Sequence, residues 1–296
     1  MTPRITVTSV KDDPKSQLLA AVYARLLEEA GLRVARKDPV EMDRAAYLDA
    51  IAKSDFQLIP DFSGELVHHL YSQDGAATTD AAPSTSASAS VNAGHSVEEQ
   101  VVAIRAQLPD TVTVGNPGAA EVKTVIACNE ATMKANKDTQ FLTYTTLTAV
   151  ASTIRIGGSA DWMANQATGY PAFQQYYGGT FKEVLTIADA DLEASLRDGK
   201  VDCVALDSMN PLVTTQSLTI LDDDKSMDIA NAAVPLITTT VATPDVINAL
   251  SKLNLSLTSA KLNQMLNQVV NGGTDPVTVA NAFMDTLGTT TETSTA

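Results

Sequence analysis

The chain has 296 residues, 44% of them hydrophobic and 19% charged, a composition typical of a globular protein with room for two domains. Its 35 acidic residues outnumber its 20 basic residues, giving a formal net charge of −15. Charge of that sign repels phosphates and anionic lipid head groups, so nucleic acid and the membrane surface are excluded as expected partners.

The amino-terminal part alternates between strand and helix patterns, which predicts a parallel sheet covered by helices on both faces. Gly31 is a natural end for the first helix, and Pro60 is expected to end the third strand. The strands are predicted at 5–10, 32–35 and 56–59, and the helices at 16–30 and 43–54.

Residues 74–95 are small and polar, with almost no large apolar side chain. Such a segment cannot offset its ordering entropy by burial, so we expect a mobile surface loop. The pattern Ser96-Val-Glu-Glu99 then forms a capping box and predicts a helix that ends near 108.

A second β/α series follows the break at Gly115-Asn-Pro-Gly118. Pro244 and Pro276 suit first helical turns near the carboxyl end, and Thr258 is a plausible N-cap. Because the chain ends in helices after two β/α series, we expect it to return to its first lobe. Lobe I is predicted to comprise 1–117 and 212–296, and lobe II 118–211. The strands of the second series are predicted at 124–128, 153–156, 184–187, 201–206, 218–221 and 234–240.

Cys128 and Cys203 both lie in apolar, strand-like runs without metal-ligand spacing. Two buried free thiols are the default interpretation and a single disulfide is the alternative, because sequence alone does not show proximity.

Several segments, in order, resemble the glycine betaine, choline and proline-betaine binding proteins of osmoprotectant importers. Lys11 and the helix that ends at Gly31 look like the opening of that family. Leu58-Ile-Pro-Asp-Phe-Ser-Gly64 is similar to its aromatic turn, and Ile156-Gly-Gly-Ser-Ala-Asp-Trp162 with Gly169-Tyr-Pro-Ala-Phe173 is similar to its glycine-rich segments. Asp198-Gly-Lys-Val-Asp-Cys-Val-Ala-Leu206 and Ala233-Val-Pro-Leu236 fit its return strands.

The resemblance implies a two-lobed α/β fold of the periplasmic-binding-protein type, each lobe a mostly parallel sheet flanked by helices. It further implies an extracytoplasmic solute-binding protein of an ABC importer, which captures a small polar ligand in the cleft between its lobes and delivers it to a membrane permease. The expected molecule is a monomer that needs no cofactor and is not an enzyme. Met1–Arg4 does not read as a signal peptide, so either the protein is cytoplasmic or an export signal has been removed.

In that family, aromatic rings hold a quaternary ammonium by cation–π attraction, while lysine, arginine and threonine bind the carboxylate. Asn165 stands where arginine is frequent in the family, so the carboxylate clamp is reduced. The carboxylates of Asp61, Asp161 and Asp207 favour a cationic ligand instead, and a ligand without a carboxylate is expected to bind better than glycine betaine. The candidate ligand-binding residues are Lys11, Phe62, Asp161, Asp207, Trp162, Thr124 and Asn165.

An enzyme, or the ligand-sensing domain of a regulator, on a similar two-lobed scaffold is the alternative. The sequence lacks the Gly-x-Ser-x-Gly elbow, the phosphate-binding loop and the His-Glu-x-x-His motif. His68 and His69 are adjacent on a predicted helix and so lie on different faces, which favours a surface or packing role over metal binding. The run Asp222–Lys225 lacks the glycine and the distal glutamate of a calcium loop and is expected to be a solvated turn.

Overall fold

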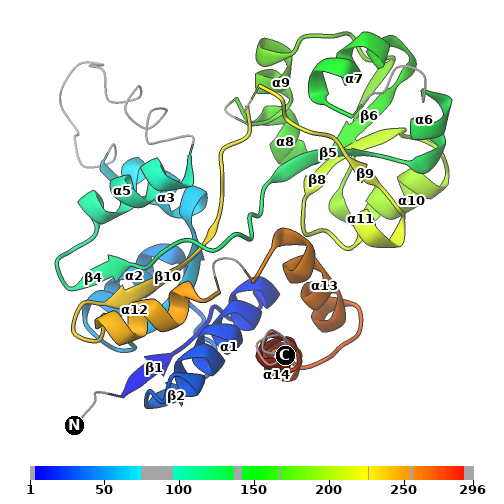
Figure 1. The fold of residues 1–296 in the computed structure, drawn as a ribbon. Coiled ribbons are helices and arrows are strands. Elements are labelled where there is room, and N and C mark those ends of the chain that lie inside the picture. The colour runs from blue at the N-terminus through cyan, green and yellow to red at the C-terminus, as the bar shows by residue number, and fades with distance from the viewer. Residues whose placement is uncertain are drawn as a thin grey trace, which may run out of the picture. The chain divides into compact units, whose positions relative to one another are not determined.

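The computed structural model describes residues 4–74, 96–136, 142–166, 168–225, 227–253 and 256–289. The predicted loop thus lies, from residue 75 to 95, outside the described residues. The chain divides into two compact α/β units (Figure 1). Unit 1 comprises Met1–Glu121 and Ala230–Ala296, and unit 2 comprises Val122–Ile229.

Unit 1 contains a five-stranded sheet of mixed direction. The first three strands of the chain run parallel, whereas β10 runs antiparallel to both of its neighbours. Because β10 comes from the carboxyl-terminal third of the chain, unit 1 needs both ends of the chain to complete its sheet. The order across the sheet is β2 (Val34–Arg36), β1 (Ile5–Val7), β3 (Leu58–Phe62), β10 (Ala233–Thr238) and β4 (Val112–Val114).

Helices cover both faces of this sheet. On one face, α2 (Arg44–Ala52), α3 (Ser63–Asp74) and α5 (Val97–Gln107) pack on strand residues such as Ile59 and Leu236. The capping box predicted for α5 is present, because Ser96 and Glu99 exchange side-chain and backbone hydrogen bonds. The other group of helices packs around α1 and comprises α1 (Pro14–Glu29), α12 (Pro244–Ser251), α13 (Ser259–Val270) and α14 (Pro276–Thr289).

The start and end of α1 follow from its sequence. Asp13 caps the helix by accepting hydrogen bonds from the amides of Lys15 (3.0 Å) and Ser16 (3.2 Å). Pro14 occupies the first turn, where its missing N–H costs nothing. Gly31 follows the helix with a φ of 75°, a conformation that glycine adopts without strain. Pro244 and Pro276 begin α12 and α14 in the same way, and Thr258 caps α13, as predicted.

The prediction that Pro60 ends the third strand is wrong. Pro60 lies inside β3, directly opposite Pro235 of β10. Neither residue has an amide hydrogen, so this pair can only occupy a position of the antiparallel ladder at which the two backbones exchange no hydrogen bonds. Because no hydrogen bond is required between the two strands at this position, neither proline leaves a carbonyl of the partner strand without a donor. The strand therefore continues to Phe62.

Unit 2 has its own five-stranded sheet, with β6 parallel to β7 and β8, and β5 antiparallel to β8 and β9. Along β8, Cys203 and Ala205 face one core while Val204 and Leu206 face the other. Helices α7 (Tyr144–Val150), α8 (Ala160–Ala164) and α9 (Tyr170–Tyr176) contribute to the first core, and α10 (Leu192–Arg197) to the second. The order across the sheet is β7 (Glu183–Thr186), β6 (Arg155–Gly158), β8 (Cys203–Asp207), β5 (Thr124–Cys128) and β9 (Thr219–Ile220).

The structure assigns residues 212–229 to unit 2, whereas the sequence analysis placed them in lobe I. The reason is β9, which pairs with β5 and so keeps this part of the chain with the second sheet. Further on, Asp222 exchanges backbone hydrogen bonds with Leu142 and Tyr144. The chain leaves unit 2 only after Ile229.

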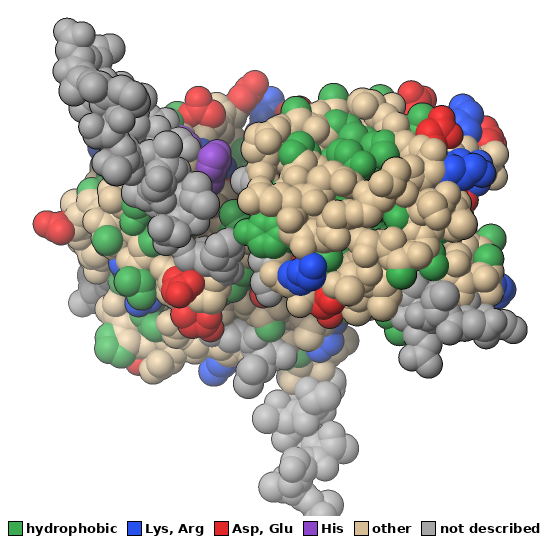
Figure 2. Space-filling view, turned by 90° about the horizontal axis from the view of Figure 1, so that it is seen from above, with side chains coloured by type: hydrophobic (Ala, Val, Ile, Leu, Met, Phe, Trp, Pro, Cys, Tyr) green, Lys and Arg blue, Asp and Glu red, His purple; other side chains and the backbone are tan. Residues whose placement is uncertain are grey.

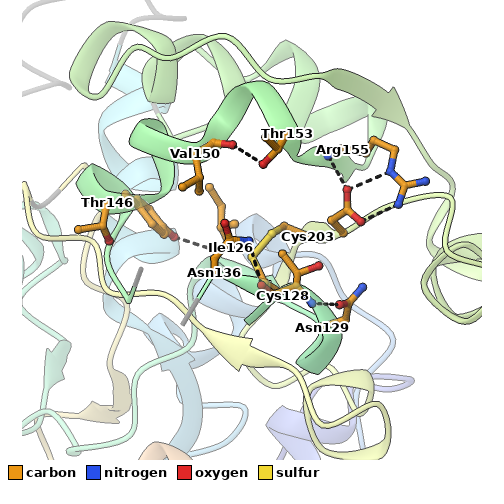
Figure 3. The surroundings of a disulfide bond; sticks show 12 residues. Ile126, Cys128, Asn129, Asn136, Thr146, Val150, Thr153, Arg155 and Cys203 are labelled. Carbon is orange, nitrogen blue, oxygen red and sulfur yellow. Dashed lines mark hydrogen bonds and ion pairs between the residues drawn. A yellow bond between two sulfur atoms is a disulfide. The ribbon is translucent and has the colours of Figure 1, made fainter. Parts of the chain in front are cut away.

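Cys128 and Cys203 form a disulfide, so the default interpretation of two free thiols is wrong. The two residues are directly opposite each other on β5 and β8, and their Cα atoms are 4.0 Å apart (Figure 3). Both are fully buried in the core that contains Tyr144 and Phe173. The bridge joins the central strand β8 of unit 2 to its neighbour β5 across 75 residues of chain.

Within the described part of the chain, no helix combines the length and the apolar character that crossing a membrane requires. On the face seen in Figure 2, acidic and basic side chains are interspersed rather than separated into large patches of one sign.

Candidate functional site

A cavity of about 250 Å³ lies in unit 1 at the carboxyl ends of its parallel strands. In open α/β sheets, this edge is where ligands bind. The cavity is formed by the end of β3 together with the first turns of α1, α2 and α3. The residues that line it include Asp13, Lys15, Asp43, Arg44, Tyr47, Asp61, Phe62 and Glu65.

Arg44 and Asp61 form a two-pronged ion pair beside this cavity. Arg44 Nη2 is 3.0 Å from Asp61 Oδ1, and Arg44 Nε is 3.2 Å from Asp61 Oδ2. Tyr47 donates its hydroxyl to Asp61 Oδ2 at 2.6 Å, and the amide of Phe62 donates to Asp61 Oδ1 at 2.7 Å. Arg44 Nη2 also contacts Glu65 at 2.7 Å. The cluster therefore joins α2, β3 and α3 at one point.

The charge of Asp61 is neutralised inside the protein. Its side chain is 2% exposed. Burial raises the pKa of Asp61 above its ordinary value, and the charge and hydrogen bonds of Arg44, the Tyr47 hydroxyl and the Phe62 amide only partly oppose this shift. Because all four hydrogen bonds are donated to the carboxylate, we assign the ionised form. The sequence analysis expected Asp61 to offer its charge to a ligand, and in the structure Arg44 already binds both of its oxygens.

Phe62 lines the cavity, but its ring is covered by a neighbouring side chain. The residue is 5% exposed, and Lys15 Nζ lies 5.8 Å from the centroid of the ring. Lys11, the lysine singled out in the sequence, lies instead in the exposed turn between β1 and α1. Its Nζ is 2.9 Å from Glu41 Oε2, and both side chains are largely exposed.

In unit 2, the predicted site residues Thr124 and Asp207 are brought together. They are direct partners across β5 and β8, at the end of the ladder. Asp207 Oδ1 accepts a hydrogen bond from the amide of Met209 at 2.7 Å, which fixes the carboxylate at the turn that follows β8. Asp161 is exposed on α8, directly after β6, the parallel neighbour of β8. All three residues thus belong to the same edge of the sheet.

Trp162 and Asn165 make contacts within unit 2 that stabilise its fold. Trp162 is 6% exposed and belongs to the core of unit 2, where its ring lies against Gly158 and Tyr170. A Cβ on Gly158 would come within 2.4 Å of the indole, so the Gly-Gly turn leaves room for that ring. Asn165 is exposed at the carboxyl end of α8, where its Oδ1 accepts from the amide of Thr168 at 3.1 Å.

The run Asp222–Lys225 is more than a solvated turn, because two of its aspartates accept hydrogen bonds from other segments of unit 2. The Tyr177 hydroxyl donates to Asp223 Oδ1, and the amide of Asp228 donates to Asp223 Oδ2 at 2.7 Å. Asp224 accepts from the amide of Thr145. Asp228 itself is buried and accepts from the Tyr144 hydroxyl at 3.2 Å. Burial, reinforced by the charge of Asp223 and opposed by Lys123 and by the Tyr144 hydrogen bond, raises the pKa of Asp228 to about 7.

The raised pKa of Asp228 predicts that the protein loses stability as the pH rises. An unfolded aspartate has a pKa of about 3.9, so between pH 4 and 7 the folded state binds more protons than the unfolded state. The free energy of unfolding therefore decreases as the pH rises through this range. Asp228→Asn should remove this penalty while keeping an acceptor for Tyr144. We expect the variant to be about 2–4 kcal/mol more stable than wild type at pH 8 and nearly equal at pH 4, measured by urea unfolding.

The matched control for this experiment is Asp222→Asn, which removes an exposed carboxyl from the same turn. It should change stability by less than about 0.5 kcal/mol at both pH values. An Asp228→Asn effect of the same size at pH 4 and pH 8 would contradict the assignment.

The described residues contain no group of three or more His, Cys, Asp or Glu side chains that could hold a metal ion. Burial and the nearby charge of Arg44 lower the pKa of His69, which leaves its imidazole neutral at pH 7. Neither His68 nor His69 is among the residues that line the cavity of unit 1.

The sequence analysis missed Lys15, Arg44 and Tyr47. Binding residues were expected at strand ends, whereas these residues lie in the first turns of the helices that follow β1 and β2. A signal was present, because Asp13-Pro14 and Asp43 both mark helix starts. The residues just after such caps return to the same edge of the sheet as the strand ends.

Two α/β units, the first built from both ends of the chain, define the class of two-lobed solute-binding proteins. The structure is similar to a glycine betaine/carnitine/choline ABC transporter structure (TM-score 0.77, 16% identity, covering 95% of this chain and 98% of that one). It is also similar to apo YehZ from Escherichia coli (TM-score 0.76, 18% identity, 96% and 99%). A lactococcal OpuAC complexed with glycine betaine has a TM-score of 0.51 at 15% identity (96% and 97%). No curated protein sequence matches the chain.

The model of the OpuAC family, the substrate binding domain of the ABC-type glycine betaine transport system, matches residues 3–286, and the chain belongs to this family. The predicted fold class and the predicted family are thereby confirmed. The chain is a solute-binding protein of an ABC importer. The family is one of substrate-binding domains, so the alternative of an enzyme or a sensor domain is not favoured.

Proposed function

We propose that this protein binds a quaternary-amine solute, choline or a betaine, outside the cytoplasm and delivers it to an ABC permease as a monomer. The observation that carries the proposal is the family match over residues 3–286, combined with an aromatic ring in the cavity at the strand ends of unit 1. A buried disulfide in unit 2 supports an extracytoplasmic location, because such bonds form and persist in oxidising compartments.

For the ligand contacts, we propose Phe62 in unit 1 as the ring that receives the ammonium group. Asp161 and Asp207 supply negative charge, and Thr124, beside Asp207, supplies a hydroxyl. The polar groups of Lys11 and Asn165 and the indole of Trp162 complete the proposed set. The neutralised Asp61 contributes through the backbone instead, since its carboxylate holds the amide of Phe62.

The experiment that tests the proposal is calorimetry with choline and glycine betaine on wild type and Phe62→Ala. Because Asn165 supplies no positive charge for a carboxylate, choline should bind more tightly than glycine betaine. Phe62→Ala should weaken choline binding about tenfold, the equivalent of a cation–π contact of about 1–2 kcal/mol.

Phe56→Leu is the matched control, because Phe56 is a buried ring of unit 1 that does not line this cavity. It should leave the affinity for choline unchanged in the folded protein. Tight binding of glycine betaine with no response to choline would overturn the account of the reduced carboxylate clamp. Equal binding of choline by wild type and Phe62→Ala would remove Phe62 from the site.

A further inference from the structure

The amide of Phe62 points away from β10. Positions with and without hydrogen bonds alternate along an antiparallel ladder. Pro60 and Pro235 face each other at a position without them, and Phe62, the next residue but one on β3, occupies the next position of the same kind. Its N–H is therefore directed to the opposite side of β3. There, in the described part of the chain, β1 ends at Val7 and no strand reaches the level of Phe62.

The side chain of Asp61 supplies the missing acceptor. Its Oδ1 accepts from the Phe62 amide at 2.7 Å, a short distance that is typical of a hydrogen bond to a charged group. Phe62 is the last residue of β3, and α3 begins at the next residue. The bond therefore fixes the backbone at the point from which the ring projects. The direction of the ring depends on where the Asp61 carboxylate is held.

Tyr47 holds this carboxylate by its other oxygen. The Tyr47 hydroxyl donates to Asp61 Oδ2 at 2.6 Å and accepts from Arg44 Nε at 2.9 Å. A phenol has one proton to donate, and here that proton is used within the protein. The hydroxyl thus joins the two charged groups without adding a charge of its own. It stabilises their arrangement and leaves no donor for a ligand.

We infer that Tyr47 is a positioning residue for ligand binding, which sets the direction of the Phe62 ring through Asp61. The inference rests on the proposed function, which gives this ring to a quaternary amine. Cation–π attraction requires the cation to lie over the face of the ring, so a change in the direction of the ring weakens it. Without the hydroxyl, Arg44 alone holds the carboxylate. The carboxylate can then rotate, its bond to the Phe62 amide loosens, and the ring is no longer fixed.

A double-mutant cycle tests whether Tyr47 acts through the ring. Calorimetry measures the affinity for choline of wild type, Tyr47→Phe, Phe62→Ala and the variant with both changes. Tyr47→Phe should weaken binding about fivefold, the equivalent of one hydrogen bond. In the Phe62→Ala background the same change should have no effect, because the ring that it positions is absent. A residue that only supports the fold would lower the affinity equally in both backgrounds. Equal losses, or no loss in the wild-type background, overturn the inference.

The matched control is Tyr23→Phe. Tyr23 is a buried tyrosine of unit 1 that does not line this cavity, so the variant removes the same hydroxyl from another place. It should leave the affinity for choline unchanged.

Arg44→Lys provides a second variant, and urea unfolding confirms that each protein is folded. Lysine keeps the positive charge but cannot bind both oxygens of Asp61 as the guanidinium does. The carboxylate is therefore loosened with Tyr47 intact. Choline binding should weaken in the wild-type background and not in Phe62→Ala, and any other pattern contradicts the proposed route through the ring.

NMR follows the hydrogen bond itself in the free protein. The Phe62 amide proton should resonate far downfield in wild type, because it is bound to a carboxylate over a short distance. It should move upfield in Tyr47→Phe and stay in place in Tyr23→Phe. An unmoved Phe62 signal in Tyr47→Phe overturns the inference alone. Failure of wild type to bind choline or glycine betaine overturns the proposed function, and the inference with it.

Discussion

Arg44→Met should destabilise the protein by about 3 kcal/mol, because it leaves the carboxylate of Asp61 buried without its partner. The loss should grow with pH. Without Arg44, burial raises the pKa of Asp61 further, so the unfolded state releases its proton first and stability falls as the pH passes from about 4 upward. Urea unfolding at pH 4.5 and pH 8 measures both effects.

Two variants make this test specific. Arg36→Met removes an arginine of unit 1 that pairs with Glu28 through two hydrogen bonds on a more exposed surface, and it should cost less than about 1 kcal/mol. Adding Asp61→Asn to Arg44→Met should recover part of the loss, since the uncompensated charge is then absent. Equal effects of Arg44→Met and Arg36→Met would show that the buried pair has no special role.

Removal of the disulfide is expected to have the largest effect on stability. Replacing Cys128 and Cys203 together by alanine should lower the free energy of unfolding of unit 2 by about 4 kcal/mol, because the bond closes a loop of 75 residues. Both sulfur atoms lie in the core, so the alanines add a small cavity to the entropic loss. Urea unfolding of oxidised wild type and of the double variant measures the difference.

A reductant provides the control for that experiment. It should lower the stability of wild type toward that of the double variant, once thiol titration confirms that the bond is open, and it should leave the double variant unchanged. Equal stability of reduced and oxidised wild type would mean that the bridge does not constrain the unfolded chain.

The alternation of strands and helices could be predicted because each element carries its own periodic pattern and its own cap. Strand 124–128 was predicted with the bounds of β5, and the capping box at Ser96 was found as written in the sequence. The shorter helices of unit 2 were harder to predict from the sequence. Helix α7 consists of threonine, alanine and a few apolar residues, and it forms because Tyr144 and Leu147 are buried in the core of unit 2.

The sequence predicts only those residues of the candidate site whose position is set by a single segment of the chain. Phe62 could be singled out because the Pro-Asp-Phe-Ser-Gly segment lies where a strand ends, and it is the last residue of β3. The pairing of Asp61 with Arg44, of Cys128 with Cys203 and of Pro60 with Pro235 depends on which strands and helices become neighbours. No local pattern carries that information. Lys11 was selected because it resembles the opening lysine of the family, whereas the contact of Lys15 with Phe62 depends on how α1 and β3 pack.

The arrangement of strands in unit 1 sets an order in which the protein can be made. Strand β4 has a single neighbour, β10, and β10 is the strand that separates it from β3. Until residue 238 has left the ribosome, the first sheet lacks its fourth member and β4 has no partner. Unit 2 is continuous from Val122 to Ile229 and holds both cysteines. Every strand that unit 2 needs is therefore present while unit 1 still waits for the last third of the chain. A growing chain thus contains all of its middle unit before the sheet begun by its first residues can be completed.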